Sequence, residues 1–426
     1  MKSTMSIDSR WLKLDNAAKI YPVVATEKNS GVFRVAAVLS EEINPSILYH
    51  AVEDCRDRFP SFFVKLHQGF FWFYYEPNLR SVIIHKESPY ICDDMNAHKN
   101  NGYLFKVLYF KKRISLEVFH SLSDGTGAFA LLKTVIFRYL ELSNHRLVND
   151  GSIIALDERA KREELEDSCN ELYTLDKIRK SPNQIAYRMK GKPFIANGGI
   201  GLIGVKLNTI ELKKIANKYH ATLSEFLVSV LSYAIIQTAN QKALQKRPLR
   251  ISVPVNMRKY LYSKSIRNFS LFFNTTVDTH GVMLGFETVL SIIKDQFQHE
   301  LTKEQLQNRL NENVSFEKNF IVKILPLFLK KLIFKIGYAI IGHRPSTISL
   351  TNFGVIQLPK DMTPFVEEFE FNIASGKKPG VAVNTYQNQT IMMFNRCFKS
   401  TDMEHAFVRF LVNEGLKVTV SSNDWE

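Results

Sequence analysis

The stretch ISLEVFHSLSDGTG, residues 114–127, joins a predicted strand to a predicted helix. Its first seven residues alternate in the way that strand residues alternate between two faces, so His120 continues the apolar row of one face at the strand's end. Asp124 and Gly125 then form a turn, and AFALLKTVIFRYLEL repeats apolar residues at helical spacing. The stretch therefore predicts a strand, a short loop and a buried helix.

His120 and Asp124 are the residues of this stretch that carry chemistry. A histidine that is partly desolvated beside a loop suits a general base with a pKa near neutrality. A structural histidine followed by a helix-capping aspartate explains the spacing equally well. A metal site would need more than these two ligands, and a serine hydrolase would need a G-x-S-x-G elbow, which the sequence lacks. General-base catalysis without a protein nucleophile is the chemical hypothesis that remains, and no metal is expected.

The 426 residues predict two globular units, because single cores seldom grow past about 250–300 residues. In the first, residues 1–150, GVFRVAAVLSE predicts a strand and INPSILYHAVEDCRDRFP a helix. Two hairpins follow, FFVKLHQGFFWFYYE and the pair YLFKVLYF and ISLEVFH. Residues 151–195 are charge-dense and rich in turn signals, which is typical of a connector.

The second unit, residues 196–426, has the same mixture of elements. Strands are predicted at GLIGVKL, RISVPVNM and LFFNTTVD, a buried helix at FLVSVLSYAIIQ, and further helices over about 285–310 and 318–341. VAVNTYQNQTIMMFNR predicts a hairpin and MEHAFVRFLVNEG a closing amphipathic helix. The expected fold class is therefore α/β (α+β), with two domains.

The amino-acid composition limits which binding partners and which cellular compartment we expect. The 56 Lys+Arg against 42 Asp+Glu give a net charge of +14, which suits an anionic partner. No zinc finger, RNP-type motif or basic block interleaved with aromatics is present, so nucleic acid is not expected. The four cysteines lie far apart and no secretory signal core is visible, which favours a reducing, cytoplasmic location.

One apolar segment, NFIVKILPLFLKKLIFKIGYAII at 319–341, admits two interpretations. Its wide apolar face and recurrent lysines could lie on an anionic membrane as a peripheral contact. More often such a helix buries one face in a core, and Pro326 would break a continuous surface helix. We expect the second.

The stretch FHSLSDG resembles the His-x-x-x-Asp-Gly motif of the CoA-dependent acyltransferase superfamily, which includes chloramphenicol acetyltransferase, condensation domains and the alcohol acetyltransferases. VPVNMRKYLYSKSIRNFSLFFNTTV at 253–277 and SLTNFGVIQLP at 349–359 resemble stretches of that family's second domain. RFPSFFVKLHQGFFWFYYE at 58–76 is similar to the alcohol acetyltransferase branch. The resemblance implies two chloramphenicol acetyltransferase-like domains with an active-site tunnel at their interface.

The same resemblance implies roles for single residues. His120 would take the proton from an alcohol or amine acceptor as it attacks the thioester of acyl-CoA directly, without an acyl-enzyme. Asp124, next to Gly125, would be structural and would pair with Arg258, with Arg267 as the second choice. A surface charge is the alternative for Arg258.

Three further residues are oxyanion or tunnel candidates on the same basis: Asn274, Thr351 and Asn352. A strand-pairing role would also explain each of them. No residue is singled out for the phosphates of CoA, since the basic residues are too many.

The sequence departs from the family at two places. Phe119 stands where condensation domains usually carry a second histidine, and the DFGWG motif of plant acyltransferases is absent. The first departure disfavours, without removing, a second hypothesis in which an acyl or peptidyl carrier protein holds the donor thioester. A third hypothesis is a non-catalytic relative that binds a lipid or a carrier.

Overall fold

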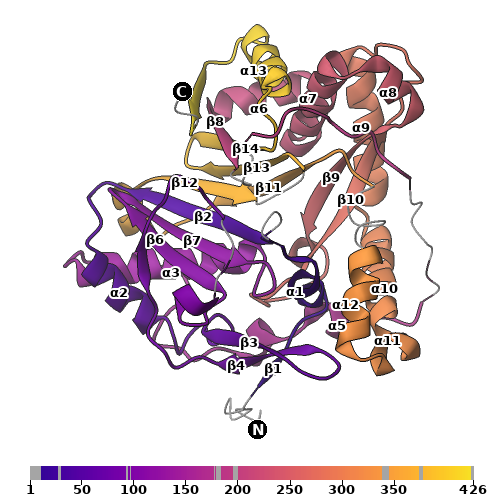
Figure 1. Ribbon diagram of the computed structural model, residues 1–426. Helices are drawn as coiled ribbons and strands as arrows, with labels where there is room; N and C mark the ends of the chain where they lie inside the picture. The colour runs from indigo at the N-terminus through magenta and orange to yellow at the C-terminus, as the bar shows by residue number, and fades with distance from the viewer. Residues whose placement is uncertain are drawn as a thin grey trace.

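The computed structural model describes residues 11–26, 30–92, 95, 97–176, 178, 184–194, 200–337, 345–373 and 378–423. Two large sheets, each covered by helices, form two lobes (Figure 1). This arrangement confirms the expected α/β class with two domain-like halves.

The first lobe is built on a five-stranded sheet in the order β12-β2-β7-β6-β5. These strands are β12 (Val366–Ile373), β2 (Val32–Leu39), β7 (Arg113–Phe119), β6 (Phe105–Phe110) and β5 (Ile84–Lys86). Helices α2 (Pro45–Asp54) and α3 (Gly125–Leu142) pack on each other, and α3 also packs on β2 and β7. The predicted strand, loop and buried helix around His120 thus lie at the centre of this lobe.

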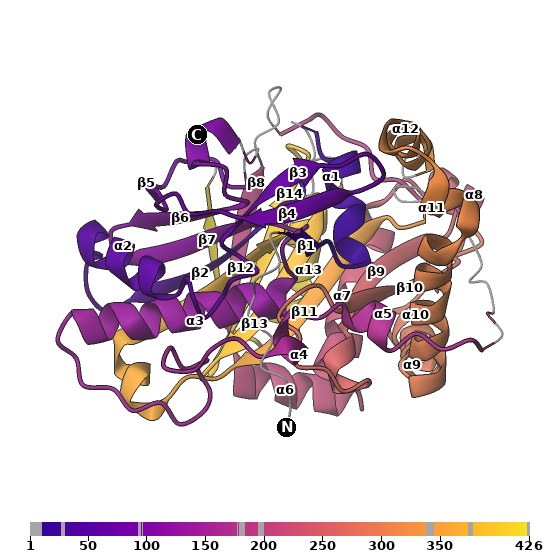
Figure 2. The same cartoon turned by 90° about the horizontal axis from the view of Figure 1, so that it is seen from below.

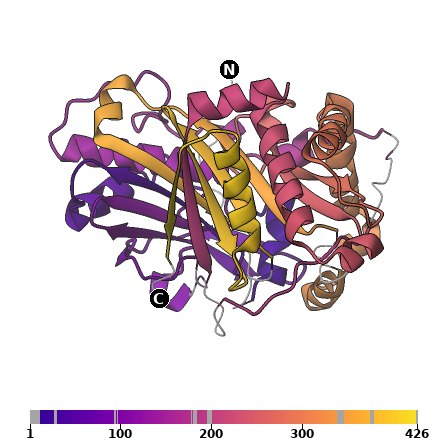
Figure 3. The same ribbon diagram turned by 90° about the horizontal axis from the view of Figure 1, so that it is seen from above.

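The second lobe is built on a seven-stranded sheet in the order β10-β9-β11-β13-β14-β8-β15. Its strands are β10 (Ser270–Val277), β9 (Leu249–Asn256), β11 (Ile348–Ile356), β13 (Gly380–Tyr386), β14 (Gln389–Arg396), β8 (Gly201–Asn208) and β15 (Val418–Ser422). Its helices include α6 (Thr209–Lys218), α7 (Leu223–Thr238), α8 (Gln241–Lys246), α9 (Phe286–Glu300) and α13 (Asp402–Asn413). Helix α7 lies between α13 and α9 on the sheet (Figure 3).

A small sheet and several helices complete the molecule (Figure 2). The sheet has the order β1-β4-β3, with β1 (Leu12–Lys13), β4 (Phe73–Pro77) and β3 (Val64–Gln68). The helices are α1 (Tyr21–Val24), α4 (Arg162–Leu165), α5 (Ser168–Glu171), α10 (Lys303–Lys318), α11 (Phe320–Ile324) and α12 (Leu327–Gly337). Short 3-10 turns lie at Ala17–Lys19, Ala97–Asn100, Met257–Lys259 and Lys360–Phe365.

The two lobes share a strand. β12 follows β11 of the second lobe in the chain, yet it pairs antiparallel with β2 of the first, from Val366 opposite Leu39 to Ile373 opposite Phe33. The division into residues 1–150, 151–195 and 196–426 stays a prediction, and this strand of the last range lies in the first lobe's sheet.

The strands and hairpins expected above are present, but two helix boundaries were wrong. The helix expected over 285–310 ends at Glu300, because Thr302 caps a new helix by accepting a hydrogen bond from the Gln305 N–H at 3.3 Å. The helix expected over 318–341 is divided at Pro326, which has no N–H to donate and disfavours helical geometry in the residue before it. Residues 338–341, the end of the expected helix, lie outside the described residues.

Within the described part of the chain, we find no single helix whose length and apolar character suffice for a membrane span. Helices α6 and α7, bent by 78°, pass that test as a pair on length and composition alone.

Candidate active site

His120 lies directly after β7, where residues of both lobes meet. Its Nδ1 is 3.1 Å from Oδ1 of Asn268, which precedes β10 of the second lobe. Tyr21, the first residue of α1, stacks on the ring with centroids 4.5 Å apart and planes 6° from parallel. Phe33 of β2 lies 5.0 Å away at a tilt. The ring is half-buried, and stacking covers its face rather than its edge.

The tautomer of His120 follows from the partners of Asn268. Nδ2 of Asn268 lies 3.3 Å from Oδ2 of Asp15 and 3.4 Å from the carbonyl oxygen of Ser121. Both are acceptors, so the amide nitrogen must face them and Oδ1 must face the ring. His120 Nδ1 therefore carries the hydrogen, and Nε2 keeps its lone pair.

The charge state of His120 agrees with a base. Burial lowers the pKa of His120 below its ordinary value of 6.5, against the opposing influence of the Asp124 charge and the Asn268 hydrogen bond. The imidazole is therefore neutral at pH 7 and can accept a proton at Nε2.

Asp124 serves two structural purposes at once. One carboxylate oxygen accepts from two backbone N–H groups in the first turn of α3, as an N-cap does. The other, Oδ2, accepts from Nη1 of Arg258 at 2.8 Å, from the Phe269 N–H at 2.9 Å and from Oγ of Ser270 at 3.0 Å. Burial alone would raise the pKa of Asp124, but the charge and hydrogen bond of Arg258 and the other two donors hold it below its ordinary value. The side chain thus ties the loop after His120 to the second lobe.

The two arginines considered for Asp124 have different partners. Besides Asp124, Arg258 donates from Nε to the carbonyl oxygen of Ser265 at 2.8 Å and from Nη2 to that of Arg267 at 2.5 Å. Arg267 instead faces Asp15, with Nε 3.5 Å from Oδ2. Arg258 is therefore the residue that the structure places against Asp124.

The glycine that the loop requires is not the one in the Asp-Gly turn. A Cβ on Gly125 would lie 3.4 Å from Cζ of Phe371, an ordinary contact distance. A Cβ on Gly127 would lie 1.9 Å from the carbonyl oxygen of Ile266 and 2.1 Å from Oγ of Ser123. The close approach of the second lobe's backbone to α3 therefore requires glycine at position 127.

A cavity of about 410 Å³ opens where two strands of the second lobe separate. β11 pairs with β9 only at Ile348 and Ser349, and beyond them the two strands diverge. The cavity is lined by residues of both lobes, among them Gly125, Thr126, Ser270, Thr351, Asn352, Lys259 and Phe371. It reaches the Asp-Gly turn, and His120 is not among the residues that line it.

The three oxyanion or tunnel candidates differ in their positions. Thr351 and Asn352 line the cavity. Asn352 is already engaged, because its Nδ2 donates to Ser224 at 3.1 Å and its Oδ1 accepts from Gly354 at 3.0 Å. Asn274 lies opposite Ser252 in the β10–β9 ladder and does not line the cavity. Of the three, Thr351 is the best placed as a donor.

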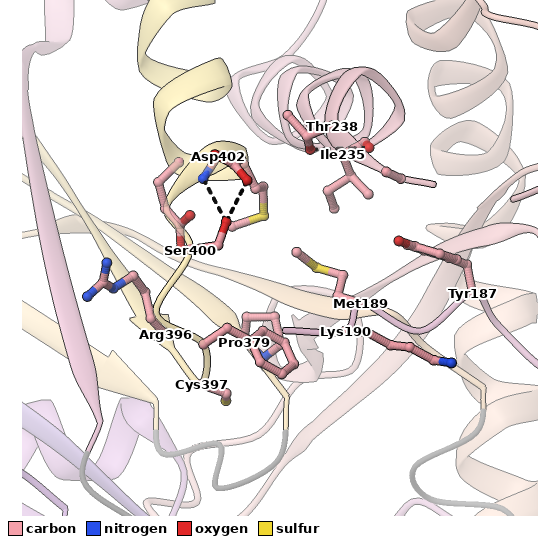
Figure 4. A pocket seen from close by; sticks show the side chains of 14 residues that line it. Tyr187, Met189, Lys190, Ile235, Thr238, Pro379, Arg396, Cys397, Ser400 and Asp402 are labelled. Carbon is pink, nitrogen blue, oxygen red and sulfur yellow. Dashed lines mark hydrogen bonds between the residues drawn. The ribbon is translucent and has the colours of Figure 1, made fainter. Parts of the chain in front are cut away.

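Figure 4 shows another cavity, of about 100 Å³, between the end of β14, the start of α13 and the end of α7. Ser400 and Asp402 in its wall hydrogen-bond to each other at the start of α13, with Ser400 Oγ donating to Asp402 Oδ2 at 2.6 Å. None of the predicted site residues lines it. Across the described ranges, no group of three or more His, Cys, Asp and Glu side chains is arranged to hold a metal ion.

Three residues of the site were missed from the sequence: Asp15, Tyr21 and Asn268. Asn268 carried a usable signal, because it follows Arg267 immediately before a predicted strand of the opposite lobe. Asp15 and Tyr21 lie in an N-terminal segment without a periodic pattern, and only the folded chain brings them to His120.

Known proteins resemble this chain in structure but not in sequence. No family model and no curated protein matches it. TRI101 of F. sporotrichioides, solved with coenzyme A and T-2, matches at TM-score 0.63 and 10% identity over 98% of this chain and 100% of that one. The chain has the fold of the CoA-dependent acyltransferases and condensation domains.

Two further solved structures, an acetyltransferase and a condensation domain, have the same fold. The trichothecene 15-O-acetyltransferase TRI3 of Fusarium sporotrichioides matches at TM-score 0.61 and 12% identity over 97% of each chain. A starter condensation domain of rhizomide synthetase, solved with C8-CoA, matches at TM-score 0.60 and 12% identity over 96% of each chain.

Proposed function

We propose that this chain is an acyltransferase that moves an acetyl or longer acyl group from a CoA thioester to an alcohol. An amine is the less favoured acceptor. The observation that carries the proposal is the position of the His120 imidazole between the lobes, with Nδ1 3.1 Å from Oδ1 of Asn268 and the Nε2 lone pair left to accept a proton.

In the proposed reaction, Nε2 of His120 takes the proton of the acceptor hydroxyl. As it does so, the hydroxyl oxygen forms a bond to the thioester carbonyl carbon. The resulting tetrahedral intermediate collapses, the carbon–sulfur bond breaks, and the imidazolium returns the proton to the CoA sulfur. The products are an ester and free CoA, and no covalent enzyme intermediate forms. Thr351 is the proposed donor to the oxyanion, because it lines the cavity that reaches the Asp-Gly turn.

Asp124 and Arg258 act in this proposal as positioning residues. Their ion pair fixes the loop that begins at His120 to the second lobe, so the base is held relative to a substrate bound between the lobes. The similar structures solved with coenzyme A and with C8-CoA support an acyl-CoA donor.

The test is release of free thiol from acetyl-CoA and longer acyl-CoAs in the presence of a panel of alcohols and amines. His120→Ala should lower the rate by about 10²-fold or more, since general-base catalysis contributes about 10²–10⁴-fold. His405→Ala, at an exposed position on α13, is the matched control and should behave as wild type. A His120→Ala variant as active as the control would refute the assignment of the base.

The choice of donor distinguishes the alternatives. Release of thiol from an acylated carrier protein but not from any acyl-CoA would favour the condensation-type reaction. Binding of acyl-CoA or a carrier without transfer to any acceptor would favour a non-catalytic relative.

A further inference from the structure

Helices α11 and α12 belong to the second half of the chain but are attached to the first half. The backbone N–H of Leu327 donates to the carbonyl oxygen of Phe70, at the tip of the β3–β4 hairpin, at 2.9 Å. The buried Lys330 places Nζ 3.0 Å from the carbonyl oxygen of Phe71 and 3.7 Å from the ring centroid of Trp72. One side of α12 therefore packs against the hairpin tip.

The opposite side of α12 is apolar and exposed. Phe328 is 65% exposed and Leu332, one turn later, is 58% exposed. Leu329 and Ile333 stand beside them at the same spacing and are also exposed, so the four form one stripe along the helix. The expectation that this segment buries its apolar face in the core was therefore wrong for these residues, because Leu327 and Lys330 are the ones that point inward.

The elements next to α12 in the chain or in space also carry exposed apolar side chains. Phe70 and Phe71 at the hairpin tip are 70% and 46% exposed, and Phe320 and Ile324 of α11 are 73% and 53% exposed. We call these eight side chains the apolar ridge: Phe70, Phe71, Phe320, Ile324, Phe328, Leu329, Leu332 and Ile333. A concentration of exposed apolar side chains on neighbouring elements points to an interaction site.

Lysines accompany the ridge, and the acids nearest to it in the sequence, Glu76 and Glu317, are paired with Lys65 and Lys19. Lys323 is exposed on α11, and Lys331 of α12 extends Nζ to Oε1 of Gln68 on the hairpin at 2.6 Å. The sequence from 318 to 360 contains no Asp or Glu, and the hairpin from 64 to 77 contains one acid, Glu76. Apolar side chains rimmed by lysines complement an anionic lipid surface, whereas in a second copy of the chain the same lysines would face each other.

We propose that the apolar ridge docks this protein peripherally on an anionic membrane, with Phe328 and Leu332 inserted at the level of the lipid headgroups. Helix α12, which carries four of the ridge residues, lies at an edge of the molecule and contacts α1 (Figures 1 and 2). Tyr21 of α1 stacks on His120, so α12 is linked to the candidate active site through α1. The docking itself does not depend on the acyltransferase chemistry.

The experiment is co-flotation of the full chain with vesicles of phosphatidylcholine, with and without phosphatidylserine. The wild type should bind the vesicles that contain phosphatidylserine, and added salt should weaken that binding. The double variant Phe328→Gln, Leu332→Gln should bind at least about tenfold more weakly, since binding no longer transfers two apolar side chains from water into the lipid. Lys323→Gln should bind about fivefold more weakly.

Two controls separate this result from trivial outcomes. Val412→Gln changes an apolar side chain that is 50% exposed on α13, far from the ridge in the sequence, and should bind as wild type. His120→Ala should also bind as wild type, whatever its activity. Circular dichroism of the double variant should match the wild type, because both changed side chains are exposed.

Three results would overturn the proposal. The first is no binding to either kind of vesicle, and the second is equal binding by the wild type and the double variant. The third is a wild-type dimer in sedimentation velocity that the double variant converts to a monomer, which would make the ridge a contact between copies of the chain.

Discussion

The ion pair between Asp124 and Arg258 should be among the costliest contacts in the molecule to break. The Asp124 side chain is 4% exposed and the Arg258 side chain is 10% exposed. Arg258 also donates hydrogen bonds to the carbonyl oxygens of Ser265 and Arg267. In Arg258→Met, the carboxylate keeps only its donors from the backbone and Ser270, and two buried carbonyls lose a donor. We therefore expect the free energy of unfolding to fall by about 3–5 kcal/mol.

A double-mutant cycle isolates the pair from its surroundings. Asp124→Asn keeps the shape of the side chain but leaves the Arg258 charge without a counterion. In the double variant neither charge is left alone, so its cost should be smaller than the sum of the two single costs by about 1–3 kcal/mol. The assay is chemical denaturation followed by circular dichroism and tryptophan fluorescence, and strictly additive costs would refute the coupling.

The cycle has a matched control and a pH signature. Lys264→Met removes an ion pair with Glu163 of the same 2.8 Å length on the surface, and it should unfold close to wild type. The pKa of Asp124 is lowered in the folded state, so its stabilisation is present above the ordinary value of 3.8 and is lost as the pH falls through the folded value. This loss should be absent from Asp124→Asn.

Three further outcomes follow from the site. Asn268→Ala should lower kcat roughly tenfold with little change in KM, because the His120 Nδ1–H loses its acceptor; steady-state kinetics would show it. Gly127→Ala should cost about 1–3 kcal/mol in denaturant unfolding and Gly125→Ala clearly less, and equal costs would contradict the contact with the second lobe. Burial raises the pKa of Asp15 to about 6, so the contribution of Asp15 to stability should decline as the pH rises from 3.8 to about 6, and the difference in unfolding free energy between wild type and Asp15→Asn should show that slope.

Local patterns in the sequence were sufficient for most of the fold. Alternation located β7 and the hairpins, apolar spacing located α3, and a body that is apolar nearly all round located the buried helix α7. The division of the helical segment at Thr302 was missed because its capping competes with an apolar pattern that continues across it.

The candidate site was only partly predictable for a physical reason. His120 and Asp124 belong to one continuous stretch, and the resemblance to the acyltransferases pointed to Arg258. Asp15 and Asn268 are brought together by packing between the lobes, which no local pattern encodes. The crossing of β12 to the first lobe likewise depends on the partner that the strand finds, and not on its own sequence.

The most direct test of the central claim is the pH dependence of kcat/KM for acyl transfer from CoA. Because burial lowers the pKa of His120, the rate of the wild type should fall only below pH 6.5, as the imidazole of the free enzyme becomes protonated. The residual activity of His120→Ala should lack this acidic limb. A wild-type profile without an acidic limb, or one whose limb lies above pH 6.5 or persists in His120→Ala, would contradict the account.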